Sequence, residues 1–156
     1  MTRAARGLAA IALVALCVAL PAAAPVAAEA PAPGADKAFA EHHLVLQLSD
    51  DSAAKADLVI SVANNLLKFY GPDRVDIEIV AFGPGVHLLE AASPERAYVD
   101  SLIAQGVRFD VCMNTIGTIA RRTGKAPVLY PKATRVDVGV ARILSLTEKG
   151  YTLVRP

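Results

Sequence analysis

From His42 to the end of the chain, short apolar runs typical of strands alternate with segments that have the apolar spacing of helices. The expected strands are residues 44–48, 75–82, 107–111, 136–138 and 151–154. The expected helices end at Gly71, Gly106, Gly124 and Gly150, because glycine is common just beyond a helix C-terminus. Strands alternating with helices predict an α/β fold whose mostly parallel sheet is covered by helices on both faces.

Polar residues and a proline indicate where the helices begin. Residues 50–52 (Asp-Asp-Ser) supply caps for the first helix, and Ser93-Pro94 opens the second with Pro94 as its first residue. Asn114 can cap the third helix. In the last helix, one face is expected to carry Val140, Ile143, Leu144 and Thr147.

The first 28 residues have the pattern of a secretory signal peptide. Arg3 and Arg6 precede an uncharged apolar run at residues 8–20, and small residues at 26–28 follow ahead of Glu29. The apolar run is short for a membrane span, so we expect export to the periplasm and no membrane span after cleavage. An uncleaved N-terminal anchor is the alternative.

Removal of residues 1–28 would leave 128 of the 156 residues, with 14 basic and 15 acidic side chains and a formal charge of −1. Such a near-neutral chain carries no electrostatic footprint for nucleic acid. Residues 29–41 predict a flexible tether, and residues 42–156 predict one domain with an ample apolar core.

Ligands of parallel α/β sheets gather beyond the carboxyl ends of the strands. Three segments are therefore expected to meet at one edge of the sheet: residues 49–51, 83–87 and 112–115. The candidate site residues in these segments are Asp50, Gly83, Gly85, His87, Cys112, Asn114 and Thr115.

Cys112 is the most informative of these residues, because the only other cysteine, Cys17, lies in the predicted signal peptide. A strand that runs directly into a helix would place this thiol at the helix N-terminus, where unpaired N–H groups favour the thiolate. Asn114 and Thr115 could add hydrogen bonds, and glycines at 83 and 85 would let the backbone approach closely. The alternative is that Cys112 is a small buried hydrophobic residue.

Several stretches resemble those of the DsrE/DsrF-like (YchN-like) family of small sulfur-relay proteins, in particular its stand-alone, uncharacterised branch. The matching stretches are residues 65–71 (NLLKFYG), 79–86 (IVAFGPGV), 106–115 (GVRFDVCMNT) and 148–156 (EKGYTLVRP). The resemblance covers residues 42–156, and several stretches in order at the right spacing make it fairly specific.

This resemblance implies a three-layer α/β/α fold, assembly into homotrimers or homohexamers, and a cysteine at position 112 that carries sulfane sulfur. In the relay members, the thiolate accepts a sulfur atom from a donor persulfide and passes it to an acceptor thiol. The partners would be donor and acceptor proteins or small thiols, and no cofactor is expected. The relay proteins are cytosolic, whereas this chain is expected to be exported.

Other functions use the same residues. Cys112 and His87 could bind copper(I), which prefers a soft sulfur and an imidazole, although two ligands make a weak site. A non-catalytic assembly module would bury Cys112 and use apolar helix faces for subunit contacts. A phosphorylation receiver lacks the acid it would need at position 112, and no phosphate-binding or dinucleotide-binding glycine motif is present.

Overall fold

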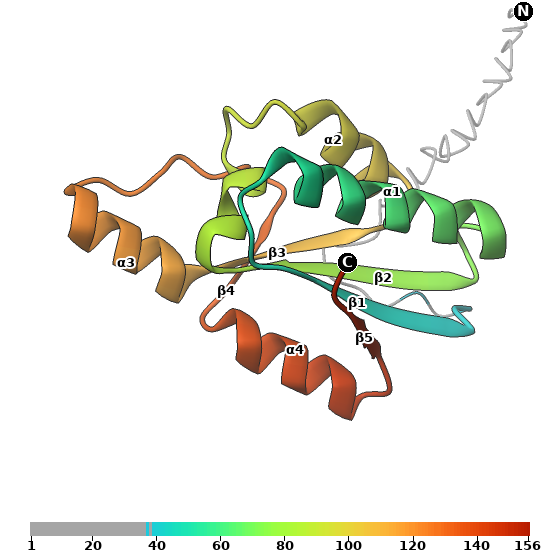
Figure 1. The fold of residues 1–156 in the computed structure, drawn as a ribbon. Coiled ribbons are helices and arrows are strands. Elements are labelled where there is room, and N and C mark those ends of the chain that lie inside the picture. The colour runs from blue at the N-terminus through green and yellow to red at the C-terminus, as the bar shows by residue number, and fades with distance from the viewer. Residues whose placement is uncertain (1–36, 38) are drawn as a thin grey trace, which may run out of the picture. The chain divides into compact units, whose positions relative to one another are not determined.

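The computed structural model describes residue 37 and residues 39–156 (Figure 1). The predicted signal peptide lies outside the described residues. Of the predicted tether, residue 37 and residues 39–41 are described. The ammonium of Lys37 donates hydrogen bonds to the backbone carbonyls of Val75 and Gln105, at 3.1 and 3.0 Å, and to that of Pro72.

The described chain forms one five-stranded sheet in which all paired strands are parallel, so the predicted α/β class is confirmed. The strands are β1 (His42–Leu48), β2 (Val75–Ala81), β3 (Arg108–Cys112), β4 (Thr134–Val136) and β5 (Thr152–Val154). Their order across the sheet is β4-β3-β2-β1-β5. β2 lies in the centre with β3 beside it, and every residue in these two strands is buried.

Helices cover both faces of the sheet. They are α1 (Ala53–Tyr70), α2 (Arg96–Ala104), α3 (Met113–Thr123) and α4 (Gly139–Glu148), with a 3₁₀ helix, η1 (Gly83–Leu89), after β2. In Figure 1, α1 and α2 lie on one face and α4 lies on the other. The larger apolar core lies under α1 and α2, and a smaller one under α4 includes Val45, Val80, Ile143, Leu146 and Tyr151. No helix in residues 39–156 is long and apolar enough to cross a membrane.

The register aligns the carboxyl ends of the strands at one edge of the sheet. Leu48 pairs with Ala81, Ala81 pairs with Val111, and Cys112 pairs with Val136. The segments that follow β1, β2 and β3 therefore meet at one edge, as the topology predicts. A fourth segment, between β4 and α4, joins them there.

Two predicted boundaries of the middle helices are wrong. Pro94 is not the first residue of α2, which begins at Arg96. Two consecutive turns precede the helix: the N–H of Ser93 donates to the carbonyl of Glu90, and the N–H of Arg96 donates to the carbonyl of Ser93. Asn114 does not cap α3, because Cys112 is the N-cap and the helix begins at Met113. The 3₁₀ helix η1 was not predicted, although its Pro84 is well suited to a first helical turn.

The predictions for the C-terminal elements also need correction. β4 ends at Val136 rather than at 138, because its partner β3 ends at Cys112 in the same register. The face of α4 that packs on the sheet carries Gly139, Ile143 and Leu146. Val140 and Leu144 were expected on the same face as Ile143, but they are 58% and 59% exposed.

Candidate functional site

Cys112 is both the last residue of β3 and the N-cap of α3. Side chains alternate along a strand, so Arg108, Asp110 and Cys112 share one face of β3 while Phe109 and Val111 enter the larger core. The face with Cys112 is the one that α4 covers. The residue is buried, with 3% of its surface exposed.

The sulfur of Cys112 is surrounded by hydrogen-bond donors. The backbone N–H of Gly139, the first residue of α4, donates to Sγ at 3.2 Å. Hydrogen bonds from the hydroxyl of Thr115 and from the N–H groups of Thr115 and Asn114 also reach the thiolate. The carbonyl of Asp137 lies 3.9 Å from Sγ and can accept the proton of the neutral thiol.

These donors decide the protonation of the thiol. Burial raises the pKa of Cys112, but the hydrogen bonds from Thr115, Gly139 and Asn114 together outweigh it and hold the pKa below its ordinary value. The thiolate is the nucleophilic form of cysteine, so this site favours a reactive sulfur. Burial alone would favour an inert one.

Thr115 links the sulfur to the segment after β2. Its Oγ1 accepts a hydrogen bond from the N–H of Gly83 at 3.0 Å. Because a hydroxyl carries one proton, accepting at the oxygen leaves that proton free to point at the sulfur of Cys112. Gly83 has φ +54°, a left-handed conformation that side chains disfavour.

We expect Thr115→Val to raise the pKa of Cys112, because it removes the hydroxyl donor while preserving the side-chain shape. The pKa can be measured from the ultraviolet absorbance of the thiolate as a function of pH, in a Cys17→Ser background where Cys112 is the only thiol. Thr118→Val is the matched control, since Thr118 Oγ1 donates to the Asn114 carbonyl within α3. An equal shift in both variants would contradict the role of Thr115.

Asn114 and Gly85 lie at the predicted edge but act differently from expectation. The Asn114 side chain is exposed, and its contribution is the backbone N–H, which also donates to Asp137 O at 3.0 Å. Gly85 does allow a close approach, but to the backbone of Leu48: a Cβ at this position would lie 2.4 Å from the Leu48 carbonyl oxygen.

Asp50 and His87 lie farther from the chemistry. Asp50 is exposed, and its Oδ1 accepts a hydrogen bond at 2.8 Å from the N–H of Ser52, the N-cap of α1. His87 is exposed, and its Nδ1 lies 2.7 Å from Oε1 of Glu90. Among the described residues, no group of three His, Cys, Asp or Glu side chains could hold a metal ion.

A surface hollow of about 350 Å³ lies beside the N-terminus of α3. Its walls include Gly83, His87, Asn114, Thr115 and Arg122. Cys112 is absent from the walls, so Thr115 stands between the hollow and the buried sulfur. The hollow and the sulfur therefore share two residues, Asn114 and Thr115.

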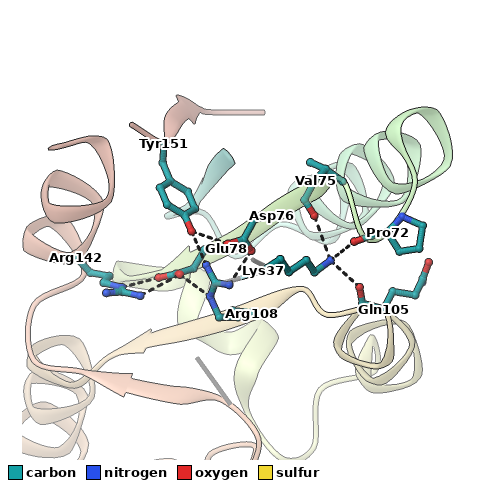
Figure 2. A network of polar contacts seen from close by, with 9 residues as sticks. All are labelled: Lys37, Pro72, Val75, Asp76, Glu78, Gln105, Arg108, Arg142 and Tyr151. Atoms are coloured by element: carbon teal, nitrogen blue, oxygen red, sulfur yellow. Dashed lines mark hydrogen bonds and ion pairs between the residues drawn. The ribbon is translucent and has the colours of Figure 1, made fainter. Parts of the chain in front are cut away.

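Sequence reasoning missed a cluster of charged side chains buried under α4. Asp76, Glu78, Arg108 and Asp110 are all at most 8% exposed, and they project from the centre of the sheet. Tyr151 and Arg142 complete the cluster, and Figure 2 shows its members other than Asp110. The signal was present in β2 and β3, where acidic or basic residues alternate with apolar ones.

Asp110 is the member of this cluster with the most displaced pKa. Burial, a hydrogen bond to Glu78 and the negative charge of Glu78 raise the pKa of Asp110 to about 8. Asp110 is then protonated at neutral pH and donates to the ionised Glu78. Asp76 and Glu78 are left to balance the two arginines, Arg108 and Arg142.

We expect the free energy of unfolding to fall as pH rises from about 5 to about 8. Asp110 keeps its proton in the native state over this range, whereas in the unfolded chain it loses it near pH 4. The unfolded state therefore binds fewer protons, so the slope is negative. Urea unfolding at several pH values measures this slope. Asp110→Asn, which mimics the protonated acid, should flatten the slope, whereas Asp57→Asn on the exposed side of α1 should retain it.

Comparisons with known proteins give a relative of known structure. No protein-family model matches the chain, and no curated protein matches it significantly. A solved structure, that of a protein of unknown function, MTH1491 from Methanobacterium thermoautotrophicum, is similar with a TM-score of 0.66 and 31% sequence identity. The similarity covers 74% of this chain and 100% of that protein, so the two share the α/β fold.

Proposed function

The chain belongs to the same family as MTH1491, a protein of unknown function, and we propose that it binds or transfers sulfane sulfur as a persulfide on Cys112. The observation that carries this proposal is the ring of donors around Sγ, from Gly139, Thr115 and Asn114, which lowers the pKa of a buried thiol. The same donors favour the thiolate, which is the form that attacks a donor persulfide. The resemblance of residues 106–115 to the sulfur-relay proteins supports the same chemistry.

The proposed reaction is a transfer of one sulfur atom. The Cys112 thiolate attacks the outer sulfur of a donor persulfide, a new S–S bond forms at Sγ, and the donor leaves as a thiolate. An acceptor thiolate then attacks the outer sulfur and releases Cys112 as the thiolate, so no net oxidation occurs. Cys112 is the only cysteine among the described residues, so no second thiol of the domain would resolve the persulfide into a disulfide.

Loading requires the sulfur to become accessible. Residues 137–139 cover it through the hydrogen bonds Gly139 N–H to Sγ and Asn114 N–H to the Asp137 carbonyl. These are two backbone contacts of a short link between β4 and α4, and their loss would uncover the sulfur without disturbing the sheet. The donor would approach once this link has moved aside.

Exposure of the purified protein to polysulfide tests the proposal. With Cys112 as the only thiol, in the Cys17→Ser background, intact mass should increase by one or more sulfur atoms, and a reductant should reverse the gain. Free-thiol titration before the reaction shows whether Cys112 is reduced. If a reduced Cys112 gains no sulfur, the proposal is wrong.

The burial of Cys112 also favours a second candidate, a non-catalytic assembly module in which the cysteine only fills space. Exposed apolar side chains at Val138, Val140 and Leu144 would suit subunit contacts in either case. Export to the periplasm and assembly into a homotrimer or homohexamer belong to our proposal. The polysulfide experiment separates the two candidates, because a space-filling cysteine held permanently under residues 137–139 would gain no sulfur.

A further inference from the structure

Arg142 is the polar side chain by which α4 is attached to the centre of the sheet. Its Nε donates to Glu78 Oε1 at 2.5 Å and to Asp110 Oδ2 at 3.1 Å, and its Nη2 donates to Glu78 Oε2 at 3.0 Å. The two carboxyl groups come from neighbouring strands, β2 and β3. Figure 2 shows the guanidinium of Arg142 reaching from its helix to Glu78 on the sheet.

Arg142 lies three residues after Gly139, so the two residues lie on the same face of α4, one above the other. Gly139 contacts the end of β3, whereas Arg142 contacts its middle. A shift of the helix relative to the sheet would therefore change both contacts together. The fork of Arg142 fixes the helix in two directions, because it binds Glu78 through two nitrogens.

Gly139 packs closely against Cys112 and Phe82. A Cβ at position 139 would lie 3.1 Å from Cβ of Phe82 and 3.2 Å from Cβ of Cys112, so the helix begins at the closest approach that glycine allows. A hydrogen bond weakens steeply as its length and angle change. An outward movement of α4 would therefore remove the Gly139 N–H from the sulfur.

We propose that Arg142 is a positioning residue for Cys112: by binding Glu78 and Asp110 it seats α4 on the sheet and keeps the Gly139 N–H on the sulfur. It does not contact the sulfur itself in any hydrogen bond of the described chain. The same clamp holds residues 137–139 over the thiol. Arg142 thus controls both the ionisation and the exposure of Cys112.

If Arg142 acted only through its charge, substitution of Glu78 would have a different effect on the pKa of Cys112. Loss of the Arg142 charge raises the pKa of Cys112 in either case. Glu78→Gln, made in an Asp110→Asn background so that Asp110 cannot ionise in its place, removes a negative charge, which through space would favour the thiolate and lower that pKa. Because glutamine also disrupts the fork, our proposal predicts that the pKa of Cys112 rises.

The test uses the full chain with Cys17→Ser and follows thiolate absorbance against pH. Arg142→Met, and Glu78→Gln in the Asp110→Asn background, should each leave about tenfold less thiolate than its parent protein at a fixed pH below the pKa, the effect of losing one hydrogen bond to a charged group. The alkylation rate per thiolate should rise as residues 137–139 become mobile. Arg135→Met, on the neighbouring strand β4 and exposed, is the matched control and should change neither quantity.

A double-mutant cycle supplies a second measurement that does not depend on Glu78. Gly139→Ala displaces the same N–H by its methyl group, so its effect on the pKa of Cys112 should not add to that of Arg142→Met. Additive effects, an unchanged pKa in folded Arg142→Met, or a lowered pKa in Glu78→Gln would each overturn the proposal. The proposal extends the proposed function, but its readout requires no sulfur loading, so either can fail without the other.

Discussion

Cys112→Ser is expected to abolish sulfur loading completely while leaving the fold intact. A serine hydroxyl forms no persulfide, so no mass gain with polysulfide can arise at position 112. The serine oxygen can still accept the Gly139 N–H that reaches Sγ at 3.2 Å in the native protein, so α4 keeps its place. Intact mass after polysulfide treatment, with circular dichroism and urea unfolding, checks both parts of this prediction.

The matched control for Cys112→Ser is Asn114→Ala. The Asn114 side chain is exposed, and its backbone N–H, which alanine keeps, supplies its hydrogen bond to the thiolate. This variant should load sulfur as the native protein does. Sulfur loading that persists in Cys112→Ser would assign the chemistry to another group and would remove the basis of the proposed function.

The sheet and its functional edge could be predicted because their signals are local. β1 contains a short apolar run, each α-helix is followed within two residues by a glycine of positive φ, and parallel strands place their carboxyl ends together whatever their order. That topology alone brings Gly83 to Thr115. It does not require knowledge of any contact between side chains.

The cover over the sulfur could not be predicted, because it depends on strand order. β4 lies beside β3 in the sheet, and only this pairing places Asp137 and Gly139 next to Cys112. A three-residue strand with partly exposed residues has no local signal for its neighbour. The role of Asn114 as a cap failed for a related reason, since β3 runs into α3 without an intervening residue.

The buried charges show a different limit of sequence reasoning. Alternation in β2 and β3 shows that Asp76, Glu78, Arg108 and Asp110 lie on one face of the sheet, but exposed polar faces give the same pattern. Burial is decided by α4, whose sheet-facing side includes Arg142 as well as apolar residues. The predicted face of the helix, with Val140, Ile143, Leu144 and Thr147, did not include Arg142, so the true orientation of the helix and the ion cluster were missed together.

Arg108→Met is expected to lower the free energy of unfolding by about 3–5 kcal/mol, the cost of leaving buried charge uncompensated. In the native protein Arg108 Nη1 lies 2.7 Å from Asp76 Oδ1, and Nε lies 2.8 Å from Glu78 Oε2. Its Nη2 also donates to the Tyr151 hydroxyl, which donates in turn to Asp76. Methionine fills similar space but leaves both carboxylates without this cation.

The pH dependence of the same variant separates lost charge from lost packing. Arg108 helps to hold the pKa of buried Glu78 low, so without Arg108 protonation of Glu78 becomes easier and the stability deficit should shrink as pH falls from 7 toward 5. A packing defect would be independent of pH. Arg74→Met, which removes the exposed ion pair with Glu41, is the control and should produce no measurable change, because solvent screens such pairs. Urea unfolding of both variants at pH 5 and pH 7 measures these changes in the free energy of unfolding. If the loss of stability in Arg108→Met is equal at the two pH values, the ionisation of the buried carboxylates does not depend on Arg108.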